Sequence, residues 1–346
     1  EDWDYYPSWR NSKAAANPGL AVAGNDDVIQ LYTSGTTGLP KGVMLTNDNY
    51  HAFFKQASLL EWSSYGVGEA VMNAMPLFHV AGVNVGVLAS QQGAKTVILR
   101  EIDPQLILKL IGDHKIAYAF WVPAVILMLT QQPNIREIDF SSLKMISYGA
   151  SPISEALLRT AGEITGARFC QLYGLTETVG AGTFMPPEAH DPAWGKLRSC
   201  GVPWPGAVVR VVDGEGNPMP TGEVGEIVIK AGFVMKGYWN REDATKEAVR
   251  GGFFHTGDAG YFDEDGFLYI HDRVKDMIVS GGENVYPAEV ENAIFGAPGV
   301  ADVAVIGVPD DKWGEAVKAI VVKKPGEDPS PESIIAWAKE RIAAYK

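Results

Sequence analysis

The sequence has 346 residues, of which 46% are hydrophobic and 21% charged, and its net charge is −13. This composition is that of a globular protein with a sizeable core, and it argues against disorder. The acidic balance argues against binding to nucleic acid, and the longest apolar run, residues 116–129, contains Pro123 and is too short to span a membrane.

Residues 1–27 are polar and are expected to form a connector. Beyond them, strands are predicted at 28–32, 96–99, 118–122 and 143–147. Helices are predicted at 46–60, 104–113 and 154–165. Alternation at this spacing favours a mainly parallel sheet with helices on its faces.

From Gly201 the pattern changes to short strands, at 208–212, 226–230 and 267–270, separated by turn formers such as Asp-Gly and Gly-Asn. Beyond about Asp272 we predict a helix at 287–295, strands at 300–308 and 317–322, and a last helix that Ser330 caps and Pro331 opens. The predicted class is α/β. A large domain, 1–271, holds a parallel α/β subdomain at 28–200 and a β-rich one at 201–271, and a small α+β domain spans 272–346.

The segment YTSGTTGLPKG at 32–42 follows a predicted strand directly. Its glycines let backbone N–H groups approach a ligand, and its hydroxyls and lysine add donors, which is what a polyphosphate requires. It is not a Walker A loop, because Pro40 stands where the second glycine would be. The candidate phosphate-binding residues are Thr33, Ser34, Gly35, Thr36, Thr37, Gly38 and Lys41.

This segment resembles the signature of the acyl-adenylate-forming, or AMP-binding, superfamily, which includes acyl-CoA synthetases, adenylation domains and luciferases. Further motifs follow in the family's order: PLFH at 76–79, YGASP at 148–152, YGLTE at 173–177, HTGD at 255–258, DRVKD at 272–276 and SGGENVYP at 280–287. The resemblance covers nearly the whole chain and is closest to fatty-acid–CoA ligases.

The resemblance implies a role for each residue of the nucleotide site. Tyr173 would stack on adenine, Thr176 would contact the α-phosphate, and Glu177 would hold Mg²⁺, in agreement with the preference of this ion for one or two carboxylates plus phosphates. Asp258 and Arg273 would bind the ribose hydroxyls. Further ATP- or AMP-binding residues would be Gly149, Ala150, Ser151 and Gln171.

Each of these segments also has a plain structural interpretation. The string at 173–177 fits a capped helix start, 149–151 fits a strand-to-helix turn, and Asp258 with Arg273 fits an exposed turn with a surface arginine. Thr176 and Glu177 are the residues that the family's chemistry would make catalytic.

The resemblance also implies a moving C-terminal domain and a thiol tunnel. Lys275 matches the hinge about which the small domain would rotate, Gly281 and Gly282 match a loop along the pantetheine tunnel, and His79 matches a gate between this tunnel and the acyl pocket. A solvated lysine and a structural histidine remain the alternatives.

The function expected is an ATP-dependent carboxylic acid–CoA ligase that uses ATP, Mg²⁺ and coenzyme A. It would form an acyl-AMP, release pyrophosphate and pass the acyl group to CoA. Small or apolar residues near the expected pocket favour a hydrophobic acid, fatty or aryl. The alternatives are an enzyme that loads a carrier-protein phosphopantetheine, a luciferase-like oxidase and, in another class, a non-catalytic nucleotide-binding regulator.

The family's catalytic lysine belongs to a segment that would follow Lys346, and relatives carry a longer region before the phosphate loop. We therefore interpret the sequence as N- and C-terminally incomplete and expect this chain by itself to adenylate poorly. Cys170 and Cys200 form no disulfide framework or metal spacing, which fits a cytoplasmic enzyme. No nucleic-acid partner is expected, and a homodimer is left open.

Overall fold

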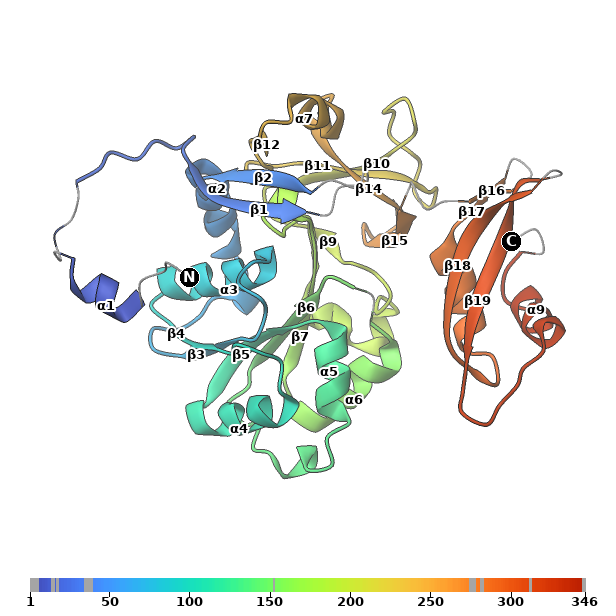
Figure 1. The fold of residues 1–346 in the computed structure, drawn as a ribbon, viewed down its shortest axis with the longest axis horizontal. Coiled ribbons are helices and arrows are strands. Elements are labelled where there is room, and N and C mark those ends of the chain that lie inside the picture. Colours follow the sequence, from blue (N-terminus) through green and yellow to red (C-terminus); the bar gives the residue numbers. More distant parts are fainter. Residues whose placement is uncertain are drawn as a thin grey trace.

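The computed structural model describes residues 6–13, 16, 19–33, 40–151, 153–273, 278–280, 283–310 and 313–343. Figure 1 shows a large sheet with helices in the centre, two smaller antiparallel sheets beside it, and the C-terminal residues in a separate lobe. The predicted α/β class is confirmed by this mixture of parallel and antiparallel sheets with helices.

The large sheet has seven strands, and its first five are parallel. In spatial order the strands are β4 (Lys95–Ile98), β3 (Ala70–Asn73), β5 (Ile116–Trp121), β6 (Met145–Gly149), β7 (Arg168–Tyr173), β8 (Thr183–Met185) and β9 (Val202–Pro203). The order reverses next to β3. Ligands of open α/β sheets bind at the carboxyl ends of the strands near such a point.

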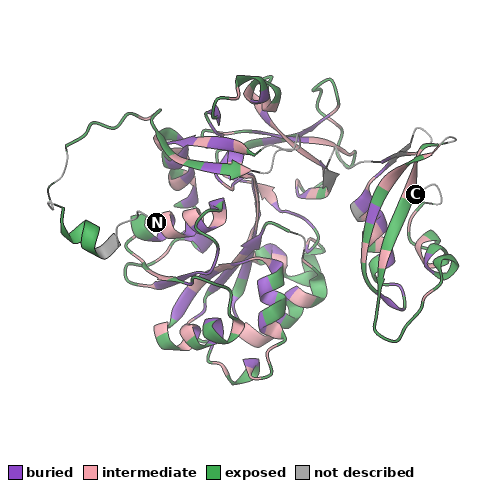
Figure 2. Ribbon diagram, in the orientation of Figure 1, coloured by how far each residue is buried: buried purple, intermediate pink, exposed green. Residues whose placement is uncertain are grey.

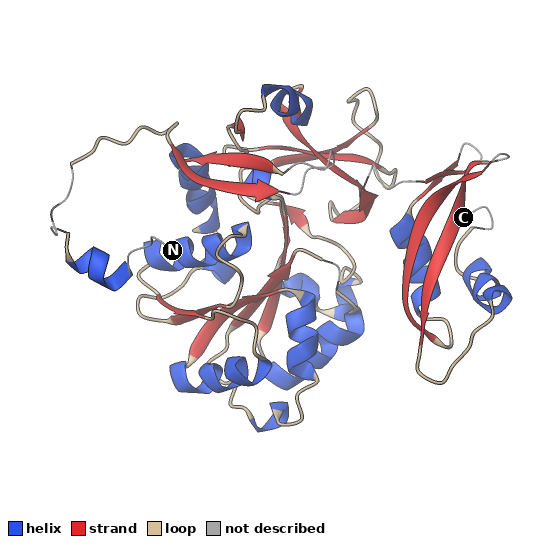
Figure 3. Ribbon diagram, viewed as in Figure 1, coloured by secondary structure: helices blue, strands red, loops and turns tan. Residues whose placement is uncertain are grey.

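Helices cover both faces of this sheet (Figure 3). One face packs against α4 (Pro104–His114), α5 (Pro123–Thr130) and α6 (Glu155–Thr165), and the other against α2 (Asn47–Ala57) and α3 (Val80–Gln91). Figure 2 shows the buried residues concentrated along the strands and the inner helix faces. Short 3₁₀ turns connect these elements: η1 (Glu61–Ser63), η2 (Ile135–Glu137), η3 (Thr176–Thr178), η4 (Pro187–His190) and η5 (Pro192–Trp194).

The helix starts follow from local capping chemistry. The Thr46 hydroxyl accepts the N–H of Asn49 at 3.2 Å, and the Asn49 amide oxygen accepts the N–H of Thr46 at 3.0 Å, which satisfies two backbone donors at the start of α2. The side chains of Asp103 and Ser154 accept backbone N–H groups at the starts of α4 and α6, without the reciprocal bond seen at α2.

Two smaller antiparallel sheets lie beside the large one. The first contains β1 (Asp27–Thr33), β2 (Lys41–Thr46) and β12 (Gly237–Tyr238). The second contains β10 (Val208–Val212), β11 (Gly225–Lys230), β14 (Phe253–Phe262), β13 (Val249–Arg250) and β15 (Leu268–Arg273), and α7 (Glu242–Ala248) adjoins it. The strand predicted at 28–32 exists, but it is half of a hairpin. A connection as short as 34–40 permits antiparallel pairing only, because a parallel crossover needs a dozen or more residues.

The C-terminal lobe has a four-stranded sheet and its own hydrophobic cluster. It contains β16 (Ile278–Ser280), β17 (Glu283–Val285), α8 (Pro287–Phe295), β18 (Val300–Asp310), β19 (Gly314–Lys323) and α9 (Pro331–Lys339). The segment expected to be a connector, residues 1–27, contains the short helix α1 (Tyr6–Asn11). None of the helices in the described part reaches the length and apolarity of a membrane span.

Candidate active site

The described residues include part of the predicted site. Thr33, Lys41, His79, Gly149, Ala150, Ser151, Gln171, Tyr173, Thr176, Glu177 and Asp258 are described, as is the backbone of Arg273. Ser34, Gly35, Thr36, Thr37, Gly38, Lys275, Gly281 and Gly282 lie outside the described residues. The motifs at 76–79, 149–151 and 173–177 all follow carboxyl ends of parallel strands, and so they share one edge of the large sheet.

Tyr173 and Asp258 meet although 85 residues separate them. The Tyr173 hydroxyl donates a hydrogen bond to Asp258 Oδ2 at 2.7 Å. Burial, together with the neighbouring Asp258 charge, raises the pKa of Tyr173 well above its usual value, so the phenol remains a donor. The side chain that would face adenine therefore also orients the carboxylate that would face ribose.

Asp258 lies within strand β14, not in the exposed turn that was its alternative. Its N–H donates to the Thr256 hydroxyl at 3.0 Å, and this hydroxyl donates to the Ile227 carbonyl at 2.7 Å. Asp258 stands opposite Arg273 in the β14–β15 ladder. The two predicted ribose-binding positions are therefore adjacent in space.

Glu177 is a buried carboxylate on the turn η3, with 7% of its surface exposed. Its Oε1 accepts a hydrogen bond from the Tyr238 hydroxyl at 2.8 Å, and its backbone carbonyl accepts the N–H of Met235 at 2.7 Å. A helix-start role for 176–177 is only partly realised, because the single 3₁₀ turn ends at Val179, which has a φ of 52°.

Lys41 and Thr33 face each other in the β1–β2 ladder, so both ends of the predicted phosphate segment are fixed at one place. The Lys41 ammonium lies 5.0 Å from the centroid of the Tyr238 ring, within the range of a cation–π contact. Tyr238 therefore contacts both Lys41 and Glu177. Sequence reasoning missed this residue, since nothing in its local pattern distinguishes it from a core tyrosine.

The turn after β6 is tightly constrained. A side chain on Gly149 would bring its Cβ to 2.3 Å from the Leu172 carbonyl oxygen on the neighbouring strand, so glycine is required there. Ala150 has a φ of 67°, which is strained for a residue with a side chain. This strain is compatible with a turn whose backbone serves a ligand.

A buried polar network supports β6 and β7 from behind. Tyr148 Oη lies 3.0 Å from His190 Nε2, and His190 Nδ1 lies 3.1 Å from the Pro186 carbonyl oxygen. Burial lowers the pKa of His190 to about 4, so the ring is neutral at pH 7, with Nδ1–H donating to Pro186 and Nε2 accepting from Tyr148. The Gln171 amide contacts Tyr148 and the Cys200 thiol, so its described contacts lie in this network.

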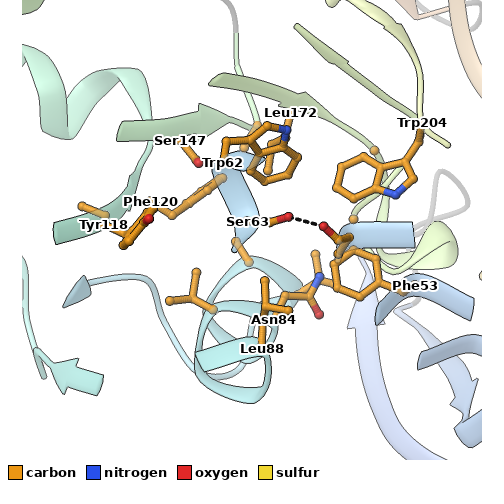
Figure 4. Close-up of a pocket in the computed structure, with 18 of the residues that line it drawn as sticks. Phe53, Trp62, Ser63, Asn84, Leu88, Tyr118, Phe120, Ser147, Leu172 and Trp204 are labelled. Carbon is orange, nitrogen blue, oxygen red and sulfur yellow. Dashed lines mark hydrogen bonds between the residues drawn. The ribbon is translucent and has the colours of Figure 1, made fainter. Parts of the chain in front are cut away.

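An aromatic cavity of about 110 Å³ adjoins the same strand ends (Figure 4). Trp62, Trp204 and Phe53 form part of its wall, and Tyr118, Phe120 and Leu172 contribute further lining. Leu172 faces this cavity whereas its neighbour Tyr173 contacts Asp258, because successive strand residues point to opposite faces.

The polar residues of the cavity wall are few. The Asn84 amide is engaged by the Tyr50 hydroxyl and the Val179 carbonyl, and the Ser63 hydroxyl donates to the Ala57 carbonyl. No Asp, Glu, Lys or Arg is among the lining residues of this described cavity. His79 lies exposed on the wall at the start of α3. The cavity suits an apolar group.

Glu177 is the side chain whose surroundings bear on Mg²⁺ binding. Within the described ranges, no group of three or more His, Cys, Asp and Glu side chains could hold a metal by itself. Mg²⁺ usually needs only one or two carboxylates when substrate phosphates complete its coordination. Glu177 fits that requirement, because one carboxylate oxygen is held by Tyr238 and no hydrogen bond to Oε2 occurs among the described residues.

Two family models and several known proteins match this chain. The family model described as "AMP-binding enzyme" matches residues 4–239, and the one described as "AMP-binding enzyme C-terminal domain" matches residues 289–346. The fatty acid–[acyl-carrier-protein] ligase ScoC of Streptomyces coeruleorubidus is 40% identical over 99% of this chain and 66% of that protein. A feruloyl-CoA synthase of Amycolatopsis sp is 40% identical over 95% of this chain and 66% of that protein.

A solved structure shows the same relationship in three dimensions. ATP-bound MatB from Rhodopseudomonas palustris superposes with a TM-score of 0.87 at 32% identity, over 98% of this chain and 66% of that one. The chain thus spans about two thirds (66%) of the length of the curated relatives it matches.

Proposed function

Because this chain belongs to the AMP-binding enzyme family, we propose that it is part of an ATP-dependent carboxylic acid–CoA ligase. One observation carries the proposal: Tyr173, bonded to Asp258, and Glu177 lie at the same strand ends as an uncharged aromatic cavity. A nucleotide site and an acyl site side by side are what the joining of an acid to AMP requires.

The nucleotide would be bound from three sides. Tyr173 offers an aromatic face to adenine, and Asp258 with Arg273 would bind the ribose hydroxyls, since a carboxylate can accept from two neighbouring hydroxyls. Backbone groups of 149–151 would line the adenine and acyl groups, and Gln171 would support them. Thr33, residues 34–38 and Lys41 would bind the β- and γ-phosphates.

Glu177 would hold Mg²⁺ together with the phosphates, and this ion would neutralise charge that develops on the departing pyrophosphate. In the first step a carboxylate oxygen attacks the α-phosphorus, the bond between the α-phosphorus and its bridging oxygen breaks, and pyrophosphate leaves. Thr176, next to Glu177, would orient the α-phosphate. This catalysis is mostly positioning and charge stabilisation.

In the second step the CoA thiolate attacks the acyl carbon, and the bond to AMP breaks. His79 would gate the thiol path, Gly281 and Gly282 would line it, and Lys275 would be the hinge that exchanges the two orientations of the small domain. The acceptor has a named alternative, since one relative is a carrier-protein ligase and another a CoA ligase.

The proposed functional division is 1–271, with subdomains 28–200 and 201–271, and a mobile domain at 272–346. The separate hydrophobic cluster of the C-terminal lobe supports it. A cytoplasmic location is supported by Cys170 and Cys200, both buried and free. Light scattering of the purified chain measures its oligomeric state and tests for a homodimer.

The acid is proposed to be hydrophobic, fatty or aryl, because the cavity lining is aromatic and aliphatic. A regulator without catalysis, the different-class alternative, has no need for an acyl cavity beside the nucleotide. Binding of acyl-adenylate mimics separates the two functions.

The experiment is calorimetric titration of the chain with AMP and with N-acylsulfamoyl adenosines that carry acetyl, butyryl, hexanoyl or benzoyl groups. Two additional buried methylenes contribute about 1.6 kcal/mol, roughly a tenfold gain in affinity. We expect the butyryl compound to bind about tenfold more tightly than the acetyl one. Equal affinities for AMP and for every acyl compound would contradict the ligase and favour the regulator. Thioester formation with CoA or with a carrier protein then identifies the acceptor.

A further inference from the structure

Tyr238 links two oppositely charged residues of the proposed site. Its hydroxyl donates to Glu177 Oε1 at 2.8 Å, and its ring lies under the Lys41 ammonium, 5.0 Å from the centroid. Tyr238 is 6% exposed and Glu177 is 7% exposed, so the hydrogen bond is shielded from water. A hydrogen bond to a charged group is stronger than one between two neutral groups.

The backbone around Tyr238 is fixed to both neighbouring elements. Tyr238 pairs with Val43 in the β2–β12 ladder, and the N–H of Trp239 donates to the Gly42 carbonyl at 2.7 Å. The N–H of Met235 donates to the Glu177 carbonyl at 2.7 Å. The short segment 235–239 thus ties the strand that begins at Lys41 to the turn that carries Glu177.

The side of the segment that faces α7 is also fixed. The N–H of Tyr238 donates to the Thr245 hydroxyl at 2.9 Å, and this hydroxyl donates to the Arg241 carbonyl at 2.8 Å. The main chain at Tyr238 therefore cannot shift relative to Glu177 without breaking these hydrogen bonds. Its position is a property of the fold.

Tyr238 contacts one negatively charged side chain, Glu177, and one positively charged side chain, Lys41. Neither Lys41 nor Glu177 forms an ion pair within the part of the chain that the structure describes. The phenol hydroxyl occupies Oε1 of Glu177 and leaves Oε2 for another partner. The ring face holds the ammonium without consuming its hydrogen-bond donors.

We infer that Tyr238 is a positioning residue that presents Glu177 Oε2 to the metal of the metal–ATP complex and keeps Lys41 directed to the phosphates. The inference rests on the proposed function, because it assigns Tyr238 a part in the same site. Hydrogen-bond partners of this kind orient metal-binding carboxylates, and their loss typically weakens metal binding about 10–100-fold. A tyrosine that only filled the core would have no such effect.

The test measures metal binding, not turnover. Mn²⁺ replaces Mg²⁺, and free Mn²⁺ is followed by electron paramagnetic resonance in the presence of a non-hydrolysable ATP analogue. The variants are Tyr238→Phe, which removes the hydroxyl and keeps the ring, Tyr238→Leu, which also removes the ring, and Glu177→Gln. Tyr261→Phe is the matched control, since the Tyr261 ring stacks on Tyr269 across the β14–β15 ladder. Thermal unfolding confirms that each variant folds.

Tyr238→Phe is expected to weaken Mn²⁺ binding about tenfold while metal-free binding of the ATP analogue stays within about twofold. Tyr238→Leu is expected to weaken both, because Lys41 loses its support. In the Glu177→Gln background, Tyr238→Phe should have no further effect on Mn²⁺.

Wild-type Mn²⁺ affinity in Tyr238→Phe would overturn the inference, as would equal losses with and without metal or a full additional loss in the Glu177→Gln background. Should the wild-type chain bind the ATP analogue in neither condition, the proposed function itself fails, and the inference fails with it. If the wild type binds the ATP analogue and Tyr238→Phe binds Mn²⁺ as tightly as the wild type, the inference fails but the proposed function stands.

Discussion

Replacing Tyr173 with phenylalanine removes a single oxygen, the one that donates to Asp258 Oδ2 at 2.7 Å. The ring that would stack on adenine remains. If the phenol holds the Asp258 carboxylate in the orientation that accepts the ribose hydroxyls, the loss must be visible in nucleotide binding. Asp258→Asn removes the charge from the other end of the same bond.

The expected magnitude follows from the chemistry of the bond. A hydrogen bond to a charged group contributes about 1.5–3 kcal/mol, and about 1.4 kcal/mol corresponds to a tenfold change in Kd. Tyr173→Phe is therefore expected to weaken AMP binding about tenfold. Because both variants disrupt one carboxylate, Tyr173→Phe combined with Asp258→Asn should weaken AMP binding by clearly less than the two separate losses added together.

The assay is isothermal calorimetry with AMP on the wild type, the two single variants and the double variant. A coupling free energy of at least about 1 kcal/mol is expected, since residues in direct contact couple by about 0.5–3 kcal/mol. Losses that add to within about 0.5 kcal/mol would show that Tyr173 and Asp258 act independently and would refute the reasoning.

Three further predictions concern stability. Gly149→Ala should destabilise the fold by about 2 kcal/mol or more, because its Cβ would approach the Leu172 oxygen to 2.3 Å, whereas Gly112→Ala, with open space in a helix, should stabilise it by up to about 1 kcal/mol in denaturant titrations. Thr46→Ala should cost about 1 kcal/mol by the same measurement. His190 has a folded-state pKa of about 4, below its ordinary value of 6.5, so the unfolded chain takes up its proton first as the pH falls. Stability is thus complete above about pH 6.5 and should fall by about 2 kcal/mol at pH 5, a loss that His190→Gln should lessen.

Much of the fold is predictable from local signals. Strand β10 and helix α8 have the bounds expected from the sequence, and Ser330 caps α9 as predicted, its hydroxyl accepting the N–H of Ser333. Helix α3 was missed because its apolar residues are not confined to one face and include glycine and valine, so neither an amphipathic stripe nor helix propensity marks it. Strand β2 was missed although its main partner is the neighbouring strand β1, because it directly follows the glycine- and threonine-rich segment, and only its second pairing, with β12, is long-range.

The candidate site, too, was predictable only in part: its residues were, but the contacts between them were not. Tyr173, Glu177 and Asp258 were each predicted separately, because each belongs to a motif with recognisable chemistry. The contacts between them were not predictable. The Tyr238 hydroxyl reaches Glu177 across 61 residues of chain and the Tyr173 hydroxyl reaches Asp258 across 85, and long-range contacts of this kind leave no local pattern. Tyr238 could be found only once the strands were placed side by side.

The most direct test of the account is a crystal structure of this chain with ATP and Mg²⁺. We expect adenine against the Tyr173 ring, the ribose hydroxyls within hydrogen-bonding distance of Asp258, and the metal between Glu177 and the phosphates. A nucleotide bound elsewhere, or one bound here with Asp258 and Glu177 both out of contact, would contradict the assignment.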